Sequence, residues 1–381
     1  MKLIEGNELE FTANGKDIAS MLTKIANVTT YIKADDAKFI IACQKGKGIH
    51  LIGSSTDALA CVKMEGEAIK SGTIKIEVDK LVGLLKARGE CTFKSSGGQI
   101  AFKETKGNFK AQIPATDFDN DDIQMLEHQM VTGGTAKPMP KEVVALMLAA
   151  VKRVRLTDFY AQHELPVIFE IGEKVMRVYC FDDHHVALFK AKSKGALPLT
   201  TALPLKAFSV IEKFIEGDKI SFTVEGGRFR ASSDNFTVSI PEGQLTYGEI
   251  GLVPQYNKSL DELKVISSMT FDSKAVGVVS NMAVLTDGET KMALTLTEKD
   301  VTMSVQGKGG RVSDKFKAKV KGKPLDIRVD PRIFMDLFNK VSGVELDMNF
   351  YKKPGAMSAY RLETKVDGGS LTLIGTFDEA K

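Results

Sequence analysis

Two short segments of the chain carry side chains of the kinds that bind metal ions. The first, residues 117–122, begins like a calcium-binding loop, in which carboxylate oxygens alternate along the chain. Such a loop needs Gly at its sixth position and Glu at its twelfth, and this chain has Asp122 and His128 there. The departures favour a solvated acidic linker over a calcium site.

The second segment is residues 182–185, which read Asp-Asp-His-His. Imidazole nitrogens and carboxylate oxygens are common zinc ligands, so a metal site is one interpretation. Neighbouring residues of a strand point to opposite faces, however, which makes it difficult for His184 and His185 to bind one ion. The alternative is a polar turn or the edge of a binding surface, and we expect neither a metal ion nor a cofactor.

The motifs that accompany common enzymatic chemistry are missing from this chain. It contains no GxxxxGK[ST] phosphate loop, GxSxG elbow, HExxH helix or Rossmann glycine fingerprint. No spacing pairs any of the five histidines with a Cys or a Ser. The four cysteines include no CxxC pair, and we expect reduced core thiols in a cytoplasmic protein. We therefore predict a protein that is not an enzyme.

Composition excludes further classes of protein. The chain has 381 residues, of which 43% are hydrophobic and 27% charged, as expected for a soluble globular protein of two or three domains. No stretch approaches the roughly 18 apolar residues of a membrane span, and the first residues lack a signal-peptide core, so we expect no membrane partner. The net charge of +3 is too small to indicate a partner, so only the distribution of charge can do so.

Basic side chains are the remaining candidates for function, because they recur on segments with helical periodicity. On a single helix such cations usually only face solvent. If equivalent helices line one surface, the same cations form a positive strip suited to a phosphate backbone. No helix carries a cluster suited to reading base edges, so DNA binding would be independent of sequence. The candidate DNA-binding residues are Lys16, Lys24, Lys33, Lys80, Lys86, Arg88, Lys141, Lys152, Arg153, Lys206, Lys213, Lys274, Arg332 and Lys340.

The elements that position these cations recur along the chain. Residues 76–114 and 203–241 both read as strand, amphipathic helix, turn, strand, Gly-Gly hairpin and strand, and they start 127 residues apart. A looser third copy begins at Ile327. Three times 127 is the length of the chain, so we expect three similar units. Antiparallel strands with helices on one face predict an α+β fold.

Further helices and two linkers complete the predicted organisation. Each third opens with a predicted helix, around residues 18–25, 140–154 and 274–285. The acidic stretch 117–122, continuing through 124–137, and residues 247–260 are predicted to be linkers. The corresponding domains are 1–122, 123–253 and 254–381.

Four stretches of the chain resemble the bacterial-type DNA polymerase sliding clamp, a family of processivity factors. They read LIGSSTDALACV, IPATDFDNDD, FDDHHVAL and AVLTDG, and they occupy residues 51–62, 113–122, 181–188 and 283–288. The resemblance covers essentially the whole chain. We identify the chain as a divergent member, and a virus-encoded (phage) clamp is one interpretation of its divergence.

The resemblance implies three similar domains, each with antiparallel sheets outside and two helices inside. Two chains would close head to tail into a homodimeric ring around double-stranded DNA. Such a ring tethers the replicative DNA polymerase, and a clamp loader would be a further partner. It would act in the cytoplasm, that of the host if the protein is virus-encoded. The alternative is a replication accessory protein of the same fold that binds DNA without forming a ring.

The resemblance also implies two protein-binding sites. A cleft between the second and third domains would receive short apolar motifs of polymerases and the clamp loader. Its residues would be Phe181, Asp183, His184, His185, Val186, Pro254, Ile374 and Phe377. At the dimer interface, Val284 and Leu285 would pack against Phe109, although an ordinary core position is an equal alternative for the first two. The family has Thr, Gly and Arg where this cleft has Phe181, Asp183 and His185, so a different peptide motif is expected.

Overall fold

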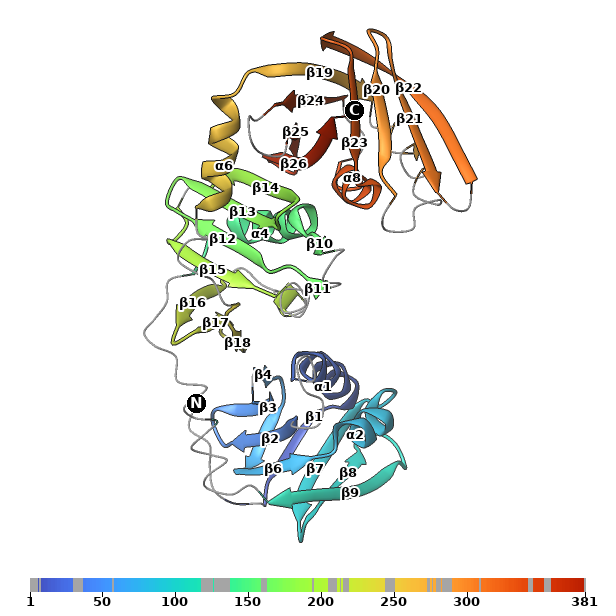
Figure 1. Cartoon of the computed structure of the whole chain (residues 1–381). Coiled ribbons are helices and arrows are strands. Elements are labelled where there is room, and N and C mark those ends of the chain that lie inside the picture. Colours follow the sequence, from blue (N-terminus) through green and yellow to red (C-terminus); the bar gives the residue numbers. More distant parts are fainter. Residues whose placement is uncertain are drawn as a thin grey trace. The chain divides into compact units, whose positions relative to one another are not determined.

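Antiparallel strands make up most of the computed structural model of the chain (Figure 1). The structure describes all residues except 1–5, 7, 30–36, 57, 118–125, 127–137, 159–162, 194, 205–210, 213, 215–218, 244–250, 273–274, 276, 279–281, 283–289, 308–309, 342–344, 353–357 and 380–381. Two compact units are described separately: unit 1 is Met1–Lys141 with Lys206–Glu242, and unit 2 is Glu142–Leu205 with Gly243–Lys381. None of the described helices is long and apolar enough to cross a membrane.

The repeated segment forms the same order of elements in its first and last copies, namely a strand, a helix and three strands. The first copy consists of β6 (Gly72–Ile76), α2 (Val78–Leu85), β7 (Glu90–Ser96), β8 (Gln99–Glu104) and β9 (Lys110–Asp117). The last copy consists of β23 (Leu325–Val329), α8 (Pro331–Phe338), β24 (Glu345–Tyr351), β25 (Ser358–Val366) and β26 (Gly369–Glu379). The middle copy has β15 (Leu199–Leu203), β16 (Ser221–Glu225), β17 (Arg228–Ser232) and β18 (Phe236–Pro241). Ile211 and Glu212 are helical, and most of the segment between β15 and β16 lies outside the described residues.

The other half of each third contributes a further set of strands. The first third contains β1 (Glu10–Asn14), α1 (Gly15–Thr29), β2 (Lys38–Gln44), β3 (Gly48–Ser54), β4 (Leu59–Met64) and β5 (Glu67–Lys70). The middle third contains α4 (Lys141–Val154), β10 (Thr157–Asp158), β11 (His163–Glu164), β12 (Val167–Ile171), β13 (Val175–Phe181) and β14 (His185–Lys192). The last third contains α6 (Leu252–Asp261), β19 (Val265–Asp272), β20 (Met292–Leu296), β21 (Asp300–Gly307) and β22 (Gly310–Gly322). The α+β pattern and the helices expected at 18–25 and 140–154 are confirmed.

Unit 1 is built on one antiparallel sheet of twelve strands, in the order β16-β17-β18-β4-β3-β2-β6-β9-β8-β7-β1-β5. Helices α1 and α2 lie side by side (Figure 1). The backbone N–H groups of Gly15 and Lys16, at the start of α1, donate to the carbonyl oxygens of Gly89 and Arg88 at 2.8 and 3.0 Å. These bonds hold the first turn of α1 beside the segment that follows α2. The cations Lys16 and Arg88 therefore lie at the same end of the helix pair.

Unit 2 contains a second sheet of twelve strands, in the order β15-β12-β13-β14-β26-β23-β20-β21-β22-β19-β24-β25. Helix α8 packs on this sheet through aromatic rings. Phe338 of α8 stacks on Phe271 of β19 with ring centroids 5.5 Å apart, and on Phe334 at 4.2 Å. Offset stacking of this kind adds to the stabilisation that burial of the rings provides.

In each unit, the sheet joins strands from different thirds of the chain. β4 pairs with β18 in unit 1, where Val62 lies opposite Phe236. β14 pairs with β26 in unit 2, where Val186 lies opposite Ile374. Each pairing satisfies backbone N–H and C=O groups that a separate third would leave open at its sheet edge. The first half of the middle third is therefore bonded to the last third, and its second half to the first third.

The linker expected at residues 247–260 is wrong, because α6 occupies most of it. Pro254 is the third residue of α6, where its missing N–H would have no helical partner in any case. Val253 and Leu260 lie on one face of α6 and are each 1% exposed, so burial of this face stabilises the helix.

Two other predicted segments fall largely outside the described residues. Of the helix expected at 274–285, only residues 275, 277, 278 and 282 are described, and these are helical. Of the acidic stretch at 117–122 and the linker that continues it to 137, only Asp117, at the end of β9, and Leu126 are described. The helix at 274–285 and the linker at 117–137 therefore stay predictions.

The four cysteines are buried and none of them forms a disulfide, as the sequence predicts. Burial raises the pKa of the Cys43 and Cys61 thiols to about 12. Since the thiolate is the reactive form, these side chains are inert packing groups near neutral pH.

Phe377 is a core residue, which differs from the expectation that it belongs to a cleft wall. Its side chain is 2% exposed and meets the ring of Phe350 edge to face, with centroids 5.9 Å apart. Successive residues of a strand point to opposite faces, so Phe377 and Ile374 cannot face the same space.

We therefore expect Phe377→Ala to lower the free energy of unfolding by about 3–5 kcal/mol, because it leaves a cavity in a packed core. Asp378→Ala, at the exposed neighbouring position, should change it by less than about 0.5 kcal/mol. Urea denaturation of both variants, followed by circular dichroism, measures the difference. Equal midpoints for Phe377→Ala and the unsubstituted chain would contradict the core assignment.

Candidate functional site

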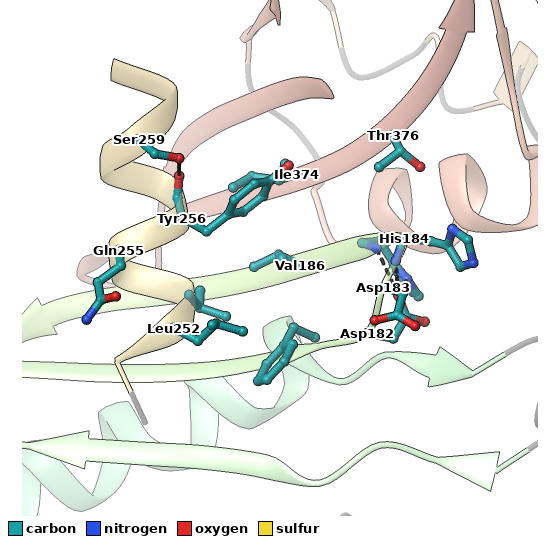
Figure 2. Close-up of a pocket in the computed structure, with 13 residues that line it drawn as sticks. Asp182, Asp183, His184, Val186, Leu252, Gln255, Tyr256, Ser259, Ile374 and Thr376 are labelled. Carbon is teal, nitrogen blue, oxygen red and sulfur yellow. Dashed lines mark hydrogen bonds and ion pairs between the residues drawn. The ribbon is translucent and has the colours of Figure 1, made fainter. Parts of the chain in front are cut away.

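Unit 2 contains a cavity of about 520 Å³ beside α6, at the joint between β14 and β26 (Figure 2). Its walls come from three places: the turn between β13 and β14, helix α6, and β26. The lining residues are Phe181, Asp182, Asp183, His184, His185, Val186, Leu252, Val253, Gln255, Tyr256, Ser259, Ile374 and Thr376.

Six of the eight residues predicted for the cleft line this cavity. Pro254 and Phe377 are the exceptions. The cleft residues predicted from the sequence do not include the wall that α6 provides, because this segment was predicted to be a linker. The spacing of Val253, Tyr256 and Leu260, three and four residues apart, was the signal that could have revealed it.

The start of α6 is held by a network on the sheet below it. The backbone N–H of Gly251 donates to Glu170 Oε1 at 2.7 Å and to the Tyr179 hydroxyl at 3.1 Å. The Tyr179 hydroxyl in turn donates to Glu170 Oε1 at 2.5 Å. Burial and this hydrogen bond raise the pKa of Tyr179, which keeps the hydroxyl a donor. Gly251 has φ of 77°, a left-handed conformation that a residue with a side chain adopts only with strain.

The end of α6 is held by Arg361 of β25. Its Nη1 donates to Asp261 Oδ1 at 2.6 Å and to Asn257 Oδ1 at 3.2 Å. The guanidinium also lies 5.3 Å from the ring centroid of Tyr351. Because α6 is fixed at both ends, the wall that it provides has a defined position relative to β14 and β26.

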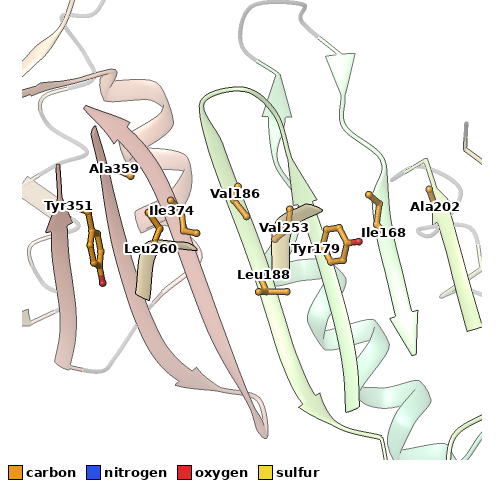
Figure 3. Packing of buried hydrophobic residues seen from close by; sticks show 10 residues of the cluster. All are labelled: Ile168, Tyr179, Val186, Leu188, Ala202, Val253, Leu260, Tyr351, Ala359 and Ile374. Carbon is orange, nitrogen blue, oxygen red and sulfur yellow. The ribbon is translucent and has the colours of Figure 1, made fainter. Parts of the chain in front are cut away.

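An apolar cluster forms the floor of the cavity and the packing under α6 (Figure 3). Val186 of β14 and Ile374 of β26 lie in this cluster, as do Val253 and Leu260 of α6. Leu252 also lines the cavity, yet its side chain remains 44% exposed. An exposed apolar residue at the mouth of an apolar hollow is typical of a site that binds an apolar group.

The opposite end of the cavity is polar, because Asp182 organises the turn between β13 and β14. Asp182 Oδ1 accepts hydrogen bonds from the backbone N–H groups of His184 and His185 at 2.7 and 2.9 Å, and lies 2.7 Å from His185 Nδ1. Burial raises the pKa of Asp182, but the hydrogen bonds from His185 and His184 outweigh it and hold the pKa below its usual range. The backbone N–H of Thr376 donates to the carbonyl of His184, which ties the turn to β26.

The two histidines of this turn lie in different environments. His185 is 2% exposed and its ring is bonded to Asp182, whereas His184 is half-buried at the rim. Among the described residues, no three or more His, Cys, Asp or Glu side chains are grouped to hold a metal ion. The cavity therefore combines an apolar floor with a fixed polar end, an arrangement suited to a short peptide with an apolar side chain.

In unit 1, the candidate DNA-binding cations are in different environments. Lys16 and Lys86 are exposed near the junction of α1 and α2. Lys80 is bonded to Glu77 at 2.6 Å. The guanidinium of Arg88 lies 3.8 Å from the ring centroid of Phe109, so these two predicted site residues contact each other. The half-buried Lys24 lies on α1.

In unit 2, several of the predicted cations are already bonded within the protein. Arg153 donates to Asp367 and to the carbonyl oxygen of Lys340, both at 2.7 Å. Lys340 is 6% exposed and donates to Asp336 at 3.1 Å. Burial lowers the pKa of Lys340, although Asp336 acts in the opposite direction.

These contacts correct two of the sequence expectations. Lys340 has almost no surface with which to meet a phosphate, and Arg332 forms an ion pair with its own helix-capping residue, Asp330, at 2.9 Å. Lys141 and Lys152 of α4 are exposed. The remaining predicted residues, which lie outside the described part of the chain, are Lys33, Lys206, Lys213, Lys274, Val284 and Leu285.

Comparison with known proteins identifies the fold. No family model matches the chain, and no curated protein matches it. The solved DNA polymerase III beta chain of Streptococcus pneumoniae TIGR4 is similar with a TM-score of 0.79 at 13% identity, over 98% of this chain and 100% of that chain. The DNA polymerase sliding clamp of Bacillus subtilis gives a TM-score of 0.76 at 15% identity, over 98% and 100%. The DNA polymerase III beta subunit of Thermotoga maritima gives 0.76 at 13%, over 98% and 100%. The fold expected from the sequence resemblance is confirmed.

The bonds to Asp182 predict a pH dependence of stability. A carboxyl whose pKa is lower in the folded state stabilises the fold above its unfolded pKa of about 3.9, and this contribution is lost as the pH falls through the folded value. Asp182→Asn should therefore reduce the free energy of unfolding at pH 7 by about 1–3 kcal/mol. The deficit should shrink as the pH falls through the folded-state pKa of Asp182, below which both proteins carry a neutral group at this position. Urea denaturation at several pH values measures it, with the exposed Asp183→Asn as the matched control. A deficit that is independent of pH would contradict the assignment.

Proposed function

We propose that the chain is a DNA sliding clamp, a ring that encircles duplex DNA and tethers the replicative DNA polymerase to it. The observation that supports this proposal most is the likeness of the fold to solved clamp chains along nearly the whole length of both. The absence of catalytic motifs from the sequence agrees with a tethering function. The proposed domains are 1–122, 123–253 and 254–381, and the proposed location is the cytoplasm, that of the host for a phage-encoded clamp.

Ring closure is proposed to occur through a head-to-tail homodimer, because three domains per chain then give a closed ring of six. Phe109 is the proposed contact on one edge, against Val284 and Leu285 of the partner subunit. A closed ring leaves no free sheet edge at the subunit boundary, which favours a discrete dimer over open assembly.

The proposed DNA-facing surface is the helix-bearing side of the sheets. Its exposed members among the described residues are Lys16, Lys80, Lys86 and Lys141 in unit 1 and Lys152 in unit 2. Enclosure keeps the duplex at a high effective concentration, so each contact can remain weak and screened by salt. Weak, exchangeable phosphate contacts permit sliding, whereas a tight site would hold the DNA in place.

The cavity beside α6 is the proposed site for short peptide motifs of the polymerase and of a clamp loader. Its floor at Val186 and Ile374 supports an apolar anchor, and Leu252 extends this apolar surface to the rim. The polar end at Asp182 and His184 offers hydrogen-bonding groups beside the anchor. This combination favours a motif that pairs an apolar side chain with a polar or basic neighbour.

Encirclement predicts that the chain is retained on circular DNA and lost from linear DNA with free ends, from which a ring slides off. The measurement is gel filtration of the protein with nicked circular DNA before and after linearisation, in the presence of its loader. Blocking both ends of the linear DNA should restore retention. Equal retention on circular and open linear DNA would instead support an accessory protein that forms no ring.

The cavity predicts that Leu252→Ser weakens binding of the cognate peptide by about tenfold, through loss of roughly 1.4 kcal/mol of apolar contact. Val265→Ser is the matched control, because Val265 is 41% exposed in the same unit and does not line the cavity. Fluorescence anisotropy with tail peptides of co-encoded replication proteins measures both variants. Equal affinities would move the peptide site elsewhere.

A further inference from the structure

Strand β22 carries a lysine at every second residue of its second half. Lys315, Lys317, Lys319 and Lys321 belong to the strand, and Lys323 follows its last residue. All five side chains are exposed, and we refer to them as the lysine row. At about 3.3–3.4 Å per residue, the row is roughly 27 Å long with a repeat of about 6.7 Å.

The lysine row lies on the face of the sheet that is opposite to α8. Phe316 and Ala318, between the lysines, are buried. The ring of Phe316 lies 5.5 Å from that of Phe271, which stacks on Phe338 of α8. Because successive strand residues point to opposite faces, the lysines point away from the helix. The row is therefore separate from the helix-bearing surface.

On the side of β21, the row has one neutral and one acidic neighbour. Lys315 lies opposite Thr302, and Lys317 lies opposite Asp300. The Asp300 carboxylate already accepts a hydrogen bond from Thr297 Oγ1 at 2.8 Å. The Asp300 carboxylate is therefore already hydrogen-bonded within the turn that precedes β21.

On the side of β19, both neighbours of the row are neutral. Lys319 lies opposite Thr270, and Lys321 lies opposite Ser268. Thr270 Oγ1 donates to Asp347 Oδ1 at 2.6 Å, which engages the nearest acid of β24. In the described part of the chain, no carboxylate oxygen lies within 4.0 Å of an ammonium nitrogen of the lysine row.

We propose that the lysine row is a docking surface for an extended acidic segment of a partner protein. Side chains on one face of an extended peptide repeat at about 6.7 Å, the same spacing as the lysines. A segment with Asp or Glu at alternate residues can therefore place a carboxylate beside each ammonium group. Five cations that have no ion-pair partner among the described residues repel one another, and a complementary anionic segment removes that repulsion.

The surroundings of the row favour an acidic peptide over a single-stranded nucleic acid. Surfaces that bind single strands combine cations with aromatic rings on which bases stack. The cross-strand neighbours of the lysines are Asp300, Thr302, Thr270 and Ser268, and none of these residues offers a ring. The proposal does not depend on the clamp function, since the row is opposite to the helix-bearing face and can be tested without DNA.

The test is binding of a fluorescent peptide of alternating Glu and Ser to the full-length chain, measured by anisotropy at about 50 mM and about 200 mM salt. Lys317→Glu, Lys319→Glu and Lys321→Glu in one variant should weaken binding at low salt at least about tenfold. The control variant carries Lys174→Glu, Lys190→Glu and Lys192→Glu, exposed positions in the same unit that change the net charge equally. It should bind within about twofold of the unsubstituted chain.

Three results would overturn the proposal. The first is unchanged binding by the lysine-row variant, and the second is an equal loss in both variants, which would report net charge alone. The third is tighter binding of a single-stranded oligonucleotide of equal charge that also depends on the row, which would make nucleic acid the occupant. Glutamine at the same three positions keeps the test valid if charge reversal impairs folding, which a thermal melt detects. Retention on circular DNA should be the same for the lysine-row variant as for the unsubstituted chain.

Discussion

The pairing of β14 with β26 is the interaction on which the candidate site depends. It bonds a strand of the middle third to the last strand of the chain, so that the turn after β13 comes to lie beside Thr376. Without that pairing, both strands would present open N–H and C=O groups, and the two walls of the cavity would have no fixed relation. β4 and β18 form the corresponding joint in unit 1. Each third of the chain thus has an edge strand with open hydrogen-bonding groups, and pairing of these edge strands joins one third to the next.

Helix α6 shows how such a joint becomes a binding site. A helix of ten residues is marginal in isolation, so its position depends on what it packs against. Glu170 holds its start, Arg361 holds its end, and the cluster around Val253 lies beneath it. The wall of the cavity is consequently formed before any ligand arrives. Binding of a peptide therefore does not carry the conformational-entropy cost of ordering this wall.

The distribution of charge illustrates why net charge is a poor guide to partners. A net charge of +3 includes cations of quite different character. Lys340 and Arg332 are bonded to carboxylates of their own helix or cap, whereas Lys16 and Lys86 are exposed near the junction of two helices. The alternation of lysines along β22 was visible in the sequence, but only the burial of Phe316 shows which face they occupy.

The sequence by itself determined the order of the elements, the repeat and the α+β class, because these depend on local periodicity. Helices α1 and α4 were predicted from the spacing of their apolar residues. Only the tertiary structure decided which residues share a site. Helix α6 was missed because its stabilising partners, Glu170 and Arg361, are 81 and 104 residues away from the positions they hold, Gly251 and Asn257. The resemblance placed Phe377 in the cleft, and no local pattern could correct this, because both faces of its strand are buried and the sequence does not show which of them meets the cavity. Strand pairing and side-chain facing are set by contacts between distant segments, and these exist only once the chain has folded.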